Sequence, residues 1–259
     1  MSPEPTKRPT PGPRSSKPAG KKAAKPTKLP GGSTYRPRTP PPAQRQRAMR
    51  IYDLLGTAYP AAHIALGYDS AFQLLVAVIL SAQTTDVGVN KVTPILFAAY
   101  PDAESLAAAD TADVERIVHP TGFFRNKTKN IQGAARAIVA EHGGRVPDTM
   151  AELITLPGVA RKTANIVLAN AYGVIEGIAV DTHVLRLSAR LGFTKHDDPI
   201  KVEADLMALF PREVWMDLTY RIIEHGRALC SGQRPICGGC IVAELCPSAF
   251  KIKGWREPK

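Results

Sequence analysis

Four cysteines near the C-terminal end are the residues whose type and spacing most clearly indicate chemistry. They are Cys230, Cys237, Cys240 and Cys246, and the 259-residue sequence contains no others. A chain of this length with 44% hydrophobic residues can build its core without cross-links. Four thiols this close together in sequence are therefore expected either to bind a metal centre or to pair as disulfides.

The identity of that group stays open on spacing alone. The chain opens with a basic, proline-rich stretch and lacks an apolar signal segment there, which argues against an oxidising compartment and against disulfides. Zinc usually takes two close-set ligand pairs, whereas only Cys237 and Cys240 form such a pair. Four thiolates without a nearby histidine suit a 4Fe-4S cluster equally well.

Positive charge is concentrated at the start of the chain. Residues 1–50 contain thirteen Lys or Arg and one acid, Glu4, whereas the other 209 residues carry 21 bases and 22 acids. Twelve of the 23 prolines also lie in residues 1–50, so we expect a disordered tail over residues 1–46. Such a tail either raises affinity for DNA through counterion release or only solubilises the protein.

The rest of the chain is predicted to be all-α. Apolar residues recur at helical spacing from Gln46 onward, and the stretch 71–80 is apolar almost all round, as expected of a helix at the centre of a bundle. Further helices are expected over 126–141, 159–172, 201–209 and 212–229, and Asp181 or Thr182 can cap another. No run of about 18 apolar residues occurs, so a membrane span is excluded.

A tight corner joins two of these helices in the segment Leu-Pro-Gly-Val-Ala-Arg-Lys-Thr-Ala, residues 156–164. Such a turn directs the unpaired N–H groups of the second helix outward, where they can receive a phosphate oxygen. Pro-Gly is also ordinary punctuation between helices, so the corner alone does not establish a binding site. The whole string resembles the helix-hairpin-helix motif of DNA glycosylases.

With Val-Asp-Thr-His at 180–183, Leu-Ser-Ala-Gln-Thr-Thr-Asp at 80–86 and the four cysteines, the chain resembles the endonuclease III family of bifunctional DNA glycosylase/AP lyases from about residue 47 to Cys246. The resemblance implies a two-lobed all-α fold: a six-helix barrel lobe over 64–174, and a lobe of 47–63 and 175–259 carrying a 4Fe-4S cluster. It also implies duplex DNA with damaged pyrimidines or abasic sites as the partner, and a cytoplasmic, nucleoid-associated monomer.

The resemblance further implies that Lys162 and Asp181 are catalytic. The chemistry is consistent with this, because a lysine amine can displace the base, form a Schiff base with the opened sugar and promote β-elimination. The ammonium must first lose its proton through burial, nearby positive charge or transfer to a partner. Asp181 is expected to stabilise the sugar cation and to help deprotonate Lys162.

Extrusion of a base from the duplex requires groups that fill the gap. By resemblance Gln83 is a polar wedge and Phe123 an apolar one, although Phe123 could instead pack beneath its loop. Asp86 is expected to organise the site by hydrogen bonding. His183 either contacts a phosphate or is a buried, hydrogen-bonded histidine.

The chain departs from the family pattern at the hairpin and in the cysteine loop. Gly158 is expected to contact phosphate, but Ala160 stands where the family usually has a second glycine. Arg234 is the only base between Cys230 and Cys237, so we expect part of the DNA affinity to lie in the tail. The alternatives are a monofunctional glycosylase of the adenine-mismatch type and a non-catalytic DNA-binding protein with a cluster.

Overall fold

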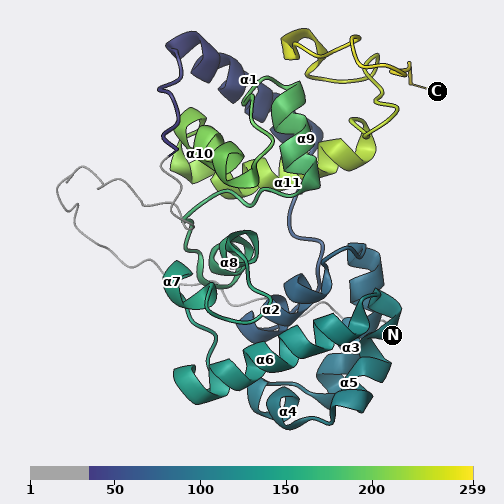
Figure 1. The fold of residues 1–259 in the computed structure, drawn as a ribbon. Helices are drawn as coiled ribbons and strands as arrows, with labels where there is room; N and C mark the ends of the chain where they lie inside the picture. Colours follow the sequence, from purple (N-terminus) through teal and green to yellow (C-terminus); the bar gives the residue numbers. More distant parts are fainter. Residues whose placement is uncertain (1–34, 259) are drawn as a thin grey trace, which may run out of the picture. The chain divides into compact units, whose positions relative to one another are not determined.

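The structure is a computed structural model that describes residues 35–258 (Figure 1). No β-strand occurs among these residues, which confirms the predicted all-α class. The helices are α1 (Pro42–Ala58), α2 (Ala71–Leu80), α3 (Asp86–Ala99), α4 (Ala103–Ala108), α5 (Thr111–Val118), α6 (Phe124–His142), α7 (Met150–Leu153), α8 (Arg161–Val167), α9 (Thr182–Arg190), α10 (Pro199–Leu209) and α11 (Trp215–Ala228). None of these helices is long and apolar enough to cross a membrane.

Helices α2 to α8 surround one hydrophobic core, and we call this part the hairpin lobe. Helix α2 lies at its centre and contacts α3, α6 and α8. Eight of its ten residues are buried, because its sequence is apolar on every face. Ser70 begins this helix by accepting a hydrogen bond from the N–H of Gln73.

Helices α1, α9, α10 and α11 enclose a second core, and with residues 229–258 they form the cysteine lobe. Helix α1 precedes the hairpin lobe in sequence but packs against α10 and α11, as Figure 1 shows. The chain therefore leaves the cysteine lobe after α1 and returns to it near Ile175, whose side chain packs on the second core. This crossing places the start of α9 beside the hairpin lobe, where the candidate site lies.

The predicted tail over residues 1–46 is too long. Residues 35–46 belong to the described part, and α1 begins at Pro42, because proline is well tolerated in the first helical turn. The Tyr35 hydroxyl donates a hydrogen bond to Asp205 of α10 at 2.6 Å. This polar contact holds the start of the described part, a segment that has few apolar side chains. Residues 1–34, which hold the rest of the predicted tail, lie outside the described residues.

Two predicted helices differ in detail from the observed ones. The segment expected as one helix over 159–172 begins at Arg161, and its last five residues, Leu168–Tyr172, form a π-helical turn. The segment expected over 212–229 opens as a 3₁₀ turn, Arg212–Val214, before α11. Hydrophobic spacing locates a helix but does not distinguish these tighter and wider turns, which occur at helix ends.

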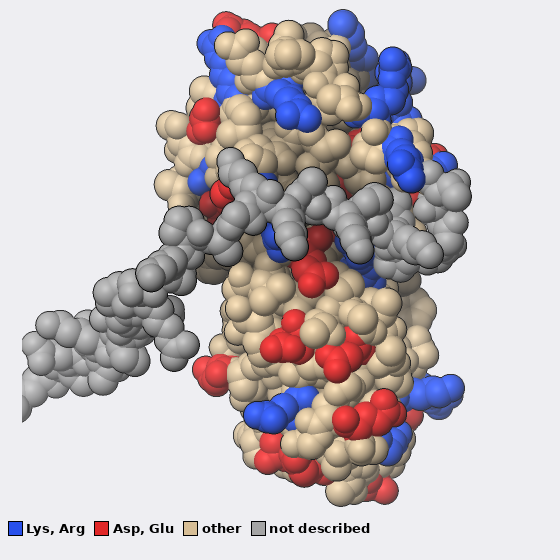
Figure 2. All heavy atoms as spheres, turned by 90° about the vertical axis from the view of Figure 1, so that its left-hand side faces the viewer, with Lys and Arg blue, Asp and Glu red and all other residues tan. Residues whose placement is uncertain are grey.

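Charged side chains of both signs are mixed on the surface. Figure 2 shows one face, on which Lys and Arg are interspersed with Asp and Glu and do not form a continuous basic area in the part that can be seen. This agrees with the near-zero net charge of the sequence after residue 50. Affinity of the described part for a polyanion therefore has to come from local groups.

Candidate active site

A cavity of about 80 Å³ lies between the two lobes, and both predicted catalytic residues line it. Lys162 enters from α8 of the hairpin lobe, and Asp181 enters from the start of α9 in the cysteine lobe. The other lining residues are His63, Ile64, Ala65, Leu66, Val78, Ser81, Asp86, Ile166, Ala179, Thr219, Tyr220, Ile223 and Arg227. An amine and a carboxylate 19 positions apart in sequence thus face a common space.

The hairpin before α8 presents Lys162. Gly158 has φ +78°, and a Cβ on it would lie 2.8 Å from Cβ of Asn130, so only glycine fits this turn. The N–H of Val159 donates to the carbonyl of Leu156 and closes the corner at 3.1 Å. The Lys162 side chain is exposed and makes no hydrogen bond or ion pair within residues 35–258. Its amine is therefore available to a substrate.

Asp181 is the N-cap of α9, as the sequence predicts. Its Oδ1 accepts a hydrogen bond from the N–H of Val184 at 2.7 Å. Negative charge is stabilised at a helix N-terminus by the unpaired N–H groups and the helix dipole. The cap also fixes the orientation of the carboxylate, and this side chain makes no second hydrogen bond within the described residues.

Asp86 and Arg227 form an ion pair across the same cavity. Nη2 of Arg227 on α11 lies 2.5 Å from Oδ2 of Asp86, the first residue of α3. Asp86 thus makes a charged hydrogen bond at the wall of the cavity. The pair joins the hairpin lobe to the cysteine lobe at the wall of the cavity.

Tyr220 and Arg227 are lining residues that the sequence did not single out. They are seven positions apart on α11, so they lie on one face of that helix, and this spacing was the available signal. Burial raises the pKa of Tyr220 to about 12, against the opposing effect of a hydrogen bond with Asn170 at 2.7 Å. The phenol is thus protonated in the cavity at neutral pH.

His183 is partly buried and hydrogen-bonded within the protein. Nη2 of Arg186 donates to its Nδ1 at 3.0 Å, which leaves the proton of the neutral ring on Nε2. Burial lowers its pKa, and the negative charge of Asp181 opposes that effect. Of the two interpretations of His183, the hydrogen-bonded one describes its contacts in the structure.

Four other predicted contact residues lie outside this cavity. Gln83 and Phe123 are exposed at turns, Ala160 is exposed just before α8, and Arg234 is exposed in the cysteine loop. Ala160 has φ −88° and ψ 169°, an extended conformation that any residue adopts, so its methyl group does not strain the hairpin.

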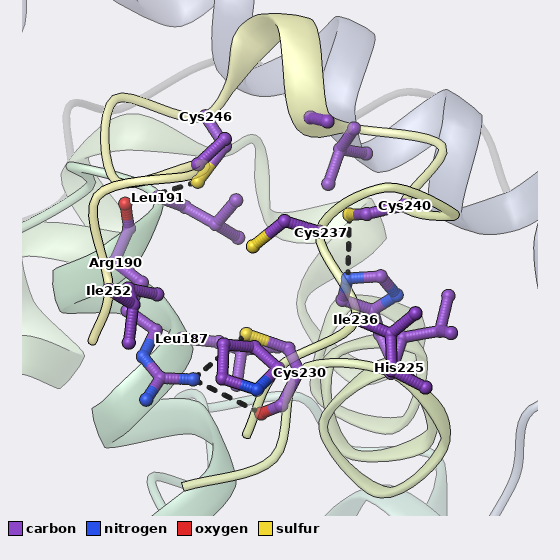
Figure 3. Close-up of a pocket in the computed structure, with 15 residues that line it drawn as sticks. Leu187, Arg190, Leu191, His225, Cys230, Ile236, Cys237, Cys240, Cys246 and Ile252 are labelled. Atoms are coloured by element: carbon purple, nitrogen blue, oxygen red, sulfur yellow. Dashed lines mark hydrogen bonds between the residues drawn. The ribbon is translucent and has the colours of Figure 1, made fainter. Parts of the chain in front are cut away.

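The four cysteines line a second cavity, in the cysteine lobe. Figure 3 shows their sulfur atoms facing a shared space. All four thiols are free. Nη1 of Arg190 donates to Sγ of Cys230 at 3.2 Å, and Nε2 of His225 lies 3.4 Å from Sγ of Cys240. The irregularly spaced cysteines of this loop thus line one cavity in the fold.

The donor set at this cavity is that of a metal centre with four thiolate ligands. Burial raises the pKa of Cys240 to about 11 and also raises that of Cys246, so these thiolates need a positively charged centre. No three His, Cys, Asp or Glu side chains of residues 35–258 converge closely enough to hold a single metal ion. Four thiolates around one cavity fit a four-iron cube, which takes one thiolate at each corner, and a tetrahedral zinc site takes four thiolates as well.

Residues 76–212 match the HhH-GPD superfamily of base excision DNA repair proteins. The chain is 58% identical to endonuclease III of Synechocystis over 207 residues, which cover 80% of this chain and 94% of the relative. It is 38% identical to endonuclease III of Escherichia coli over 211 residues, covering 80% of this chain and 98% of that protein. The chain belongs to the endonuclease III family.

A solved structure agrees with this assignment. A trapped covalent intermediate of an endonuclease III with DNA superimposes with a TM-score of 0.77 and 41% identity, covering 80% of this chain and 97% of that one. The resemblance inferred from the motifs is confirmed. As an endonuclease III family member, the protein is a base excision repair DNA glycosylase and AP lyase that acts on oxidised pyrimidines in DNA.

Proposed function

We propose that Lys162 is the nucleophile of both reactions and that Asp181 stabilises the positive charge developing on the deoxyribose. The observation that carries this proposal is that an unpaired amine and an oriented carboxylate line one cavity. Catalysis requires interactions that strengthen as charge develops, and a carboxylate fixed by a helix cap needs little reorganisation to provide one.

The amine attacks C1′ as the bond from C1′ to the base nitrogen breaks, and the base leaves with a proton. The sugar ring then opens to a Schiff base between C1′ and Nζ of Lys162. The imine acidifies the C2′ proton, and its removal expels the 3′ phosphate by breaking the C3′–O bond. Asp181 is a candidate to take the proton from the Lys162 ammonium, because both line the cavity and its carboxylate is not engaged in an ion pair within the described residues.

The DNA contacts are proposed from the exposed residues around the cavity. Gln83 and Phe123 are side chains that can enter the space left by an extruded nucleotide. Ala160 precedes α8 and provides no side-chain cap for the first N–H groups of that helix. These N–H groups, together with the backbone at Gly158, can therefore donate hydrogen bonds to a phosphate oxygen. Arg234 and His183 are candidates for further backbone contacts.

Cys230, Cys237, Cys240 and Cys246 are proposed to hold a 4Fe-4S cluster. When bound, the cluster neutralises the thiolates and cross-links the loop after α11. Arg190 and His225 then lie beside the ligand sulfurs, within hydrogen-bonding distance of them. We expect the cluster to be structural, because the cysteine cavity is separate from the one lined by Lys162.

The protein is also proposed to act as a monomer on chromosomal DNA in the cytoplasm. Both candidate catalytic residues come from one chain, so the site needs no second copy. Duplexes with a damaged pyrimidine or an abasic site are the expected partners. Size-exclusion chromatography with light scattering, in the presence and absence of such a duplex, tests the oligomeric state.

Incision of a duplex holding one thymine glycol, with borohydride present, tests the catalytic proposal. Wild-type protein is expected to form a covalent adduct with DNA, because borohydride reduces the Schiff base. Lys162→Gln is expected to form none. Lys195→Gln, which replaces an exposed lysine that lines neither cavity, is the matched control and should trap normally. An adduct with Lys162→Gln would show that another amine is the nucleophile.

A further inference from the structure

Two exposed side chains stand on backbone that non-glycine residues rarely adopt. Gln83 has φ 54° and Phe123 has φ 47°, and Phe123 is 67% exposed. Such left-handed conformations persist only when neighbouring structure holds them. Gln83 lies in the turn between α2 and α3, and Phe123 precedes α6, so the two turns are 40 positions apart in sequence.

A buried lysine joins these turns. Nζ of Lys127, in the first turn of α6, donates to Oγ1 of Thr84 at 2.6 Å and to the carbonyl of Thr121 at 2.7 Å. Thr84 follows Gln83 directly, and its hydroxyl also donates to the carbonyl of Thr121 at 2.5 Å. The three polar atoms form a closed triangle under the two turns.

The backbone of Lys127 holds the second turn as well. Its N–H donates to the carbonyl of Phe123 at 3.1 Å. One residue therefore bonds to both sides of Gly122, whose own φ is +67°. The two hydrogen bonds from Lys127, to Thr121 and to Phe123, thus hold the left-handed residues Gly122 and Phe123 in place.

Stability alone does not account for a lysine at this position. Lys127 is 3% exposed, and no carboxylate within residues 35–258 forms an ion pair with it. Burial lowers its pKa, which reflects the cost of holding this charge away from water. An aliphatic side chain would avoid that cost but could not bond to the two turns.

We infer that Lys127 is a positioning residue that couples the two turns, so that Gln83 and Phe123 are presented to damaged DNA as one preformed pair. The inference rests on the proposed role of these two residues as wedges. Two separate flexible turns would each lose conformational freedom on binding, whereas a preformed pair has already been ordered by folding.

Lys127→Met tests the inference, because it keeps the length of the side chain and removes its donors. The probe is a duplex with a tetrahydrofuran abasic analogue and 2-aminopurine next to it. Affinity is expected to fall by ~10-fold, with loss of the fluorescence rise that reports unstacking. Affinity for an undamaged duplex should stay unchanged. Lys129→Met, which removes an exposed lysine of α6, is the control and should keep the fluorescence rise.

Coupling to the wedges separates positioning from a general structural role. In a Gln83→Ala/Phe123→Ala background, Lys127→Met should cause no further loss, because no wedge remains to be positioned. An additional ~10-fold loss there would overturn the inference. If Lys127→Met does not fold, Thr84→Val removes the central hydroxyl of the triangle at nearly constant volume and must give the same pattern.

The outcome is independent of the catalytic proposal. The kcat of Lys127→Met at saturating DNA should stay within ~3-fold of wild type while KM rises, because Lys162 is untouched. Normal abasic-site binding by Gln83→Ala/Phe123→Ala would overturn both the wedge roles and the coupling, yet leave adduct formation by Lys162 intact. Loss of the adduct with normal 2-aminopurine signals would instead count against the proposed nucleophile alone.

Discussion

Arg161 of α8 and Glu203 of α10 form a buried ion pair, with 2.7 Å between Nε and Oε2. Their side chains are 13% and 5% exposed, and Nδ2 of Asn165 donates to the other carboxylate oxygen at 2.9 Å. Arg161 immediately precedes Lys162. The pair therefore connects the helix that carries the proposed nucleophile to the lobe that carries Asp181, and fixes how the two walls of the cavity meet.

Removal of one partner of this pair should be costly. Arg161→Met leaves Glu203 charged, buried and without its cation, and we expect a loss of ~3–5 kcal/mol in the free energy of unfolding. The double variant Arg161→Met/Glu203→Met should recover much of this loss, because no buried charge remains. Urea denaturation of the three proteins measures both effects. A single-variant loss below ~1 kcal/mol would mean that the pair behaves like an exposed one.

Two substitutions of Asp181 distinguish the hydrogen bond with which it caps α9 from the negative charge of its carboxylate. Asparagine caps a helix as well as aspartate does, so Asp181→Asn should keep the stability of the protein. Asp181→Ala loses the hydrogen bond to the N–H of Val184 and should cost ~1 kcal/mol. Both should slow single-turnover adduct formation by ~10²-fold or more, since neither provides a carboxylate.

The two results are compared by chemical denaturation and by borohydride trapping with an abasic duplex. A normal trapping rate for Asp181→Asn would remove the carboxylate from the chemistry and leave Asp181 a structural cap. Glu213→Gln, an exposed acid in the 3₁₀ turn before α11, controls for a general change in protein charge.

The composition of the cysteine site gives a third prediction. Purified protein should contain about four iron and four sulfide per chain and absorb visible light. Cys237→Ser, at the most buried of the four cysteines, should lower the iron content and the stability together, because metal binding is coupled to folding. One zinc per chain without sulfide would establish the alternative that the cysteine spacing leaves open.

The fold class, the helix cap at Asp181 and the position of Lys162 at a helix start could be predicted because their signals are local. A segment apolar all round indicates a central helix, as α2 is, and Asp181 just before an apolar helical pattern indicates a cap. The hairpin string placed Lys162 at a helix start. Each of these features depends on residues within a few positions of each other, so no knowledge of tertiary contacts was needed.

The remaining features depend on contacts that sequence spacing does not encode. Tyr220 and Arg227 line the cavity only because α11 packs beside the hairpin lobe. Lys127 gives the pattern of a solvated lysine at a helix start, yet it is buried by the turn just before α6 and by the distant turn that holds Thr84. The end of the predicted tail was misplaced for the same reason, since Tyr35 is held by Asp205, 170 positions away.

The basic N-terminal segment gives the last prediction. Residues 1–34 contain eight Lys or Arg and one acid, whereas the charges visible on the described part are mixed. Each phosphate neutralised by a lysine or arginine contributes about −0.9 to the slope of log K against log salt. Deletion of residues 1–34 should therefore make the slope for an undamaged duplex less steep by ~1 or more, measured by fluorescence anisotropy between 50 and 200 mM salt. A full-length variant with these eight bases changed to Gln is the matched control and should give the same slope as the deletion. Identical slopes for the intact, deleted and Gln-substituted proteins would reduce the segment to a solubilising extension.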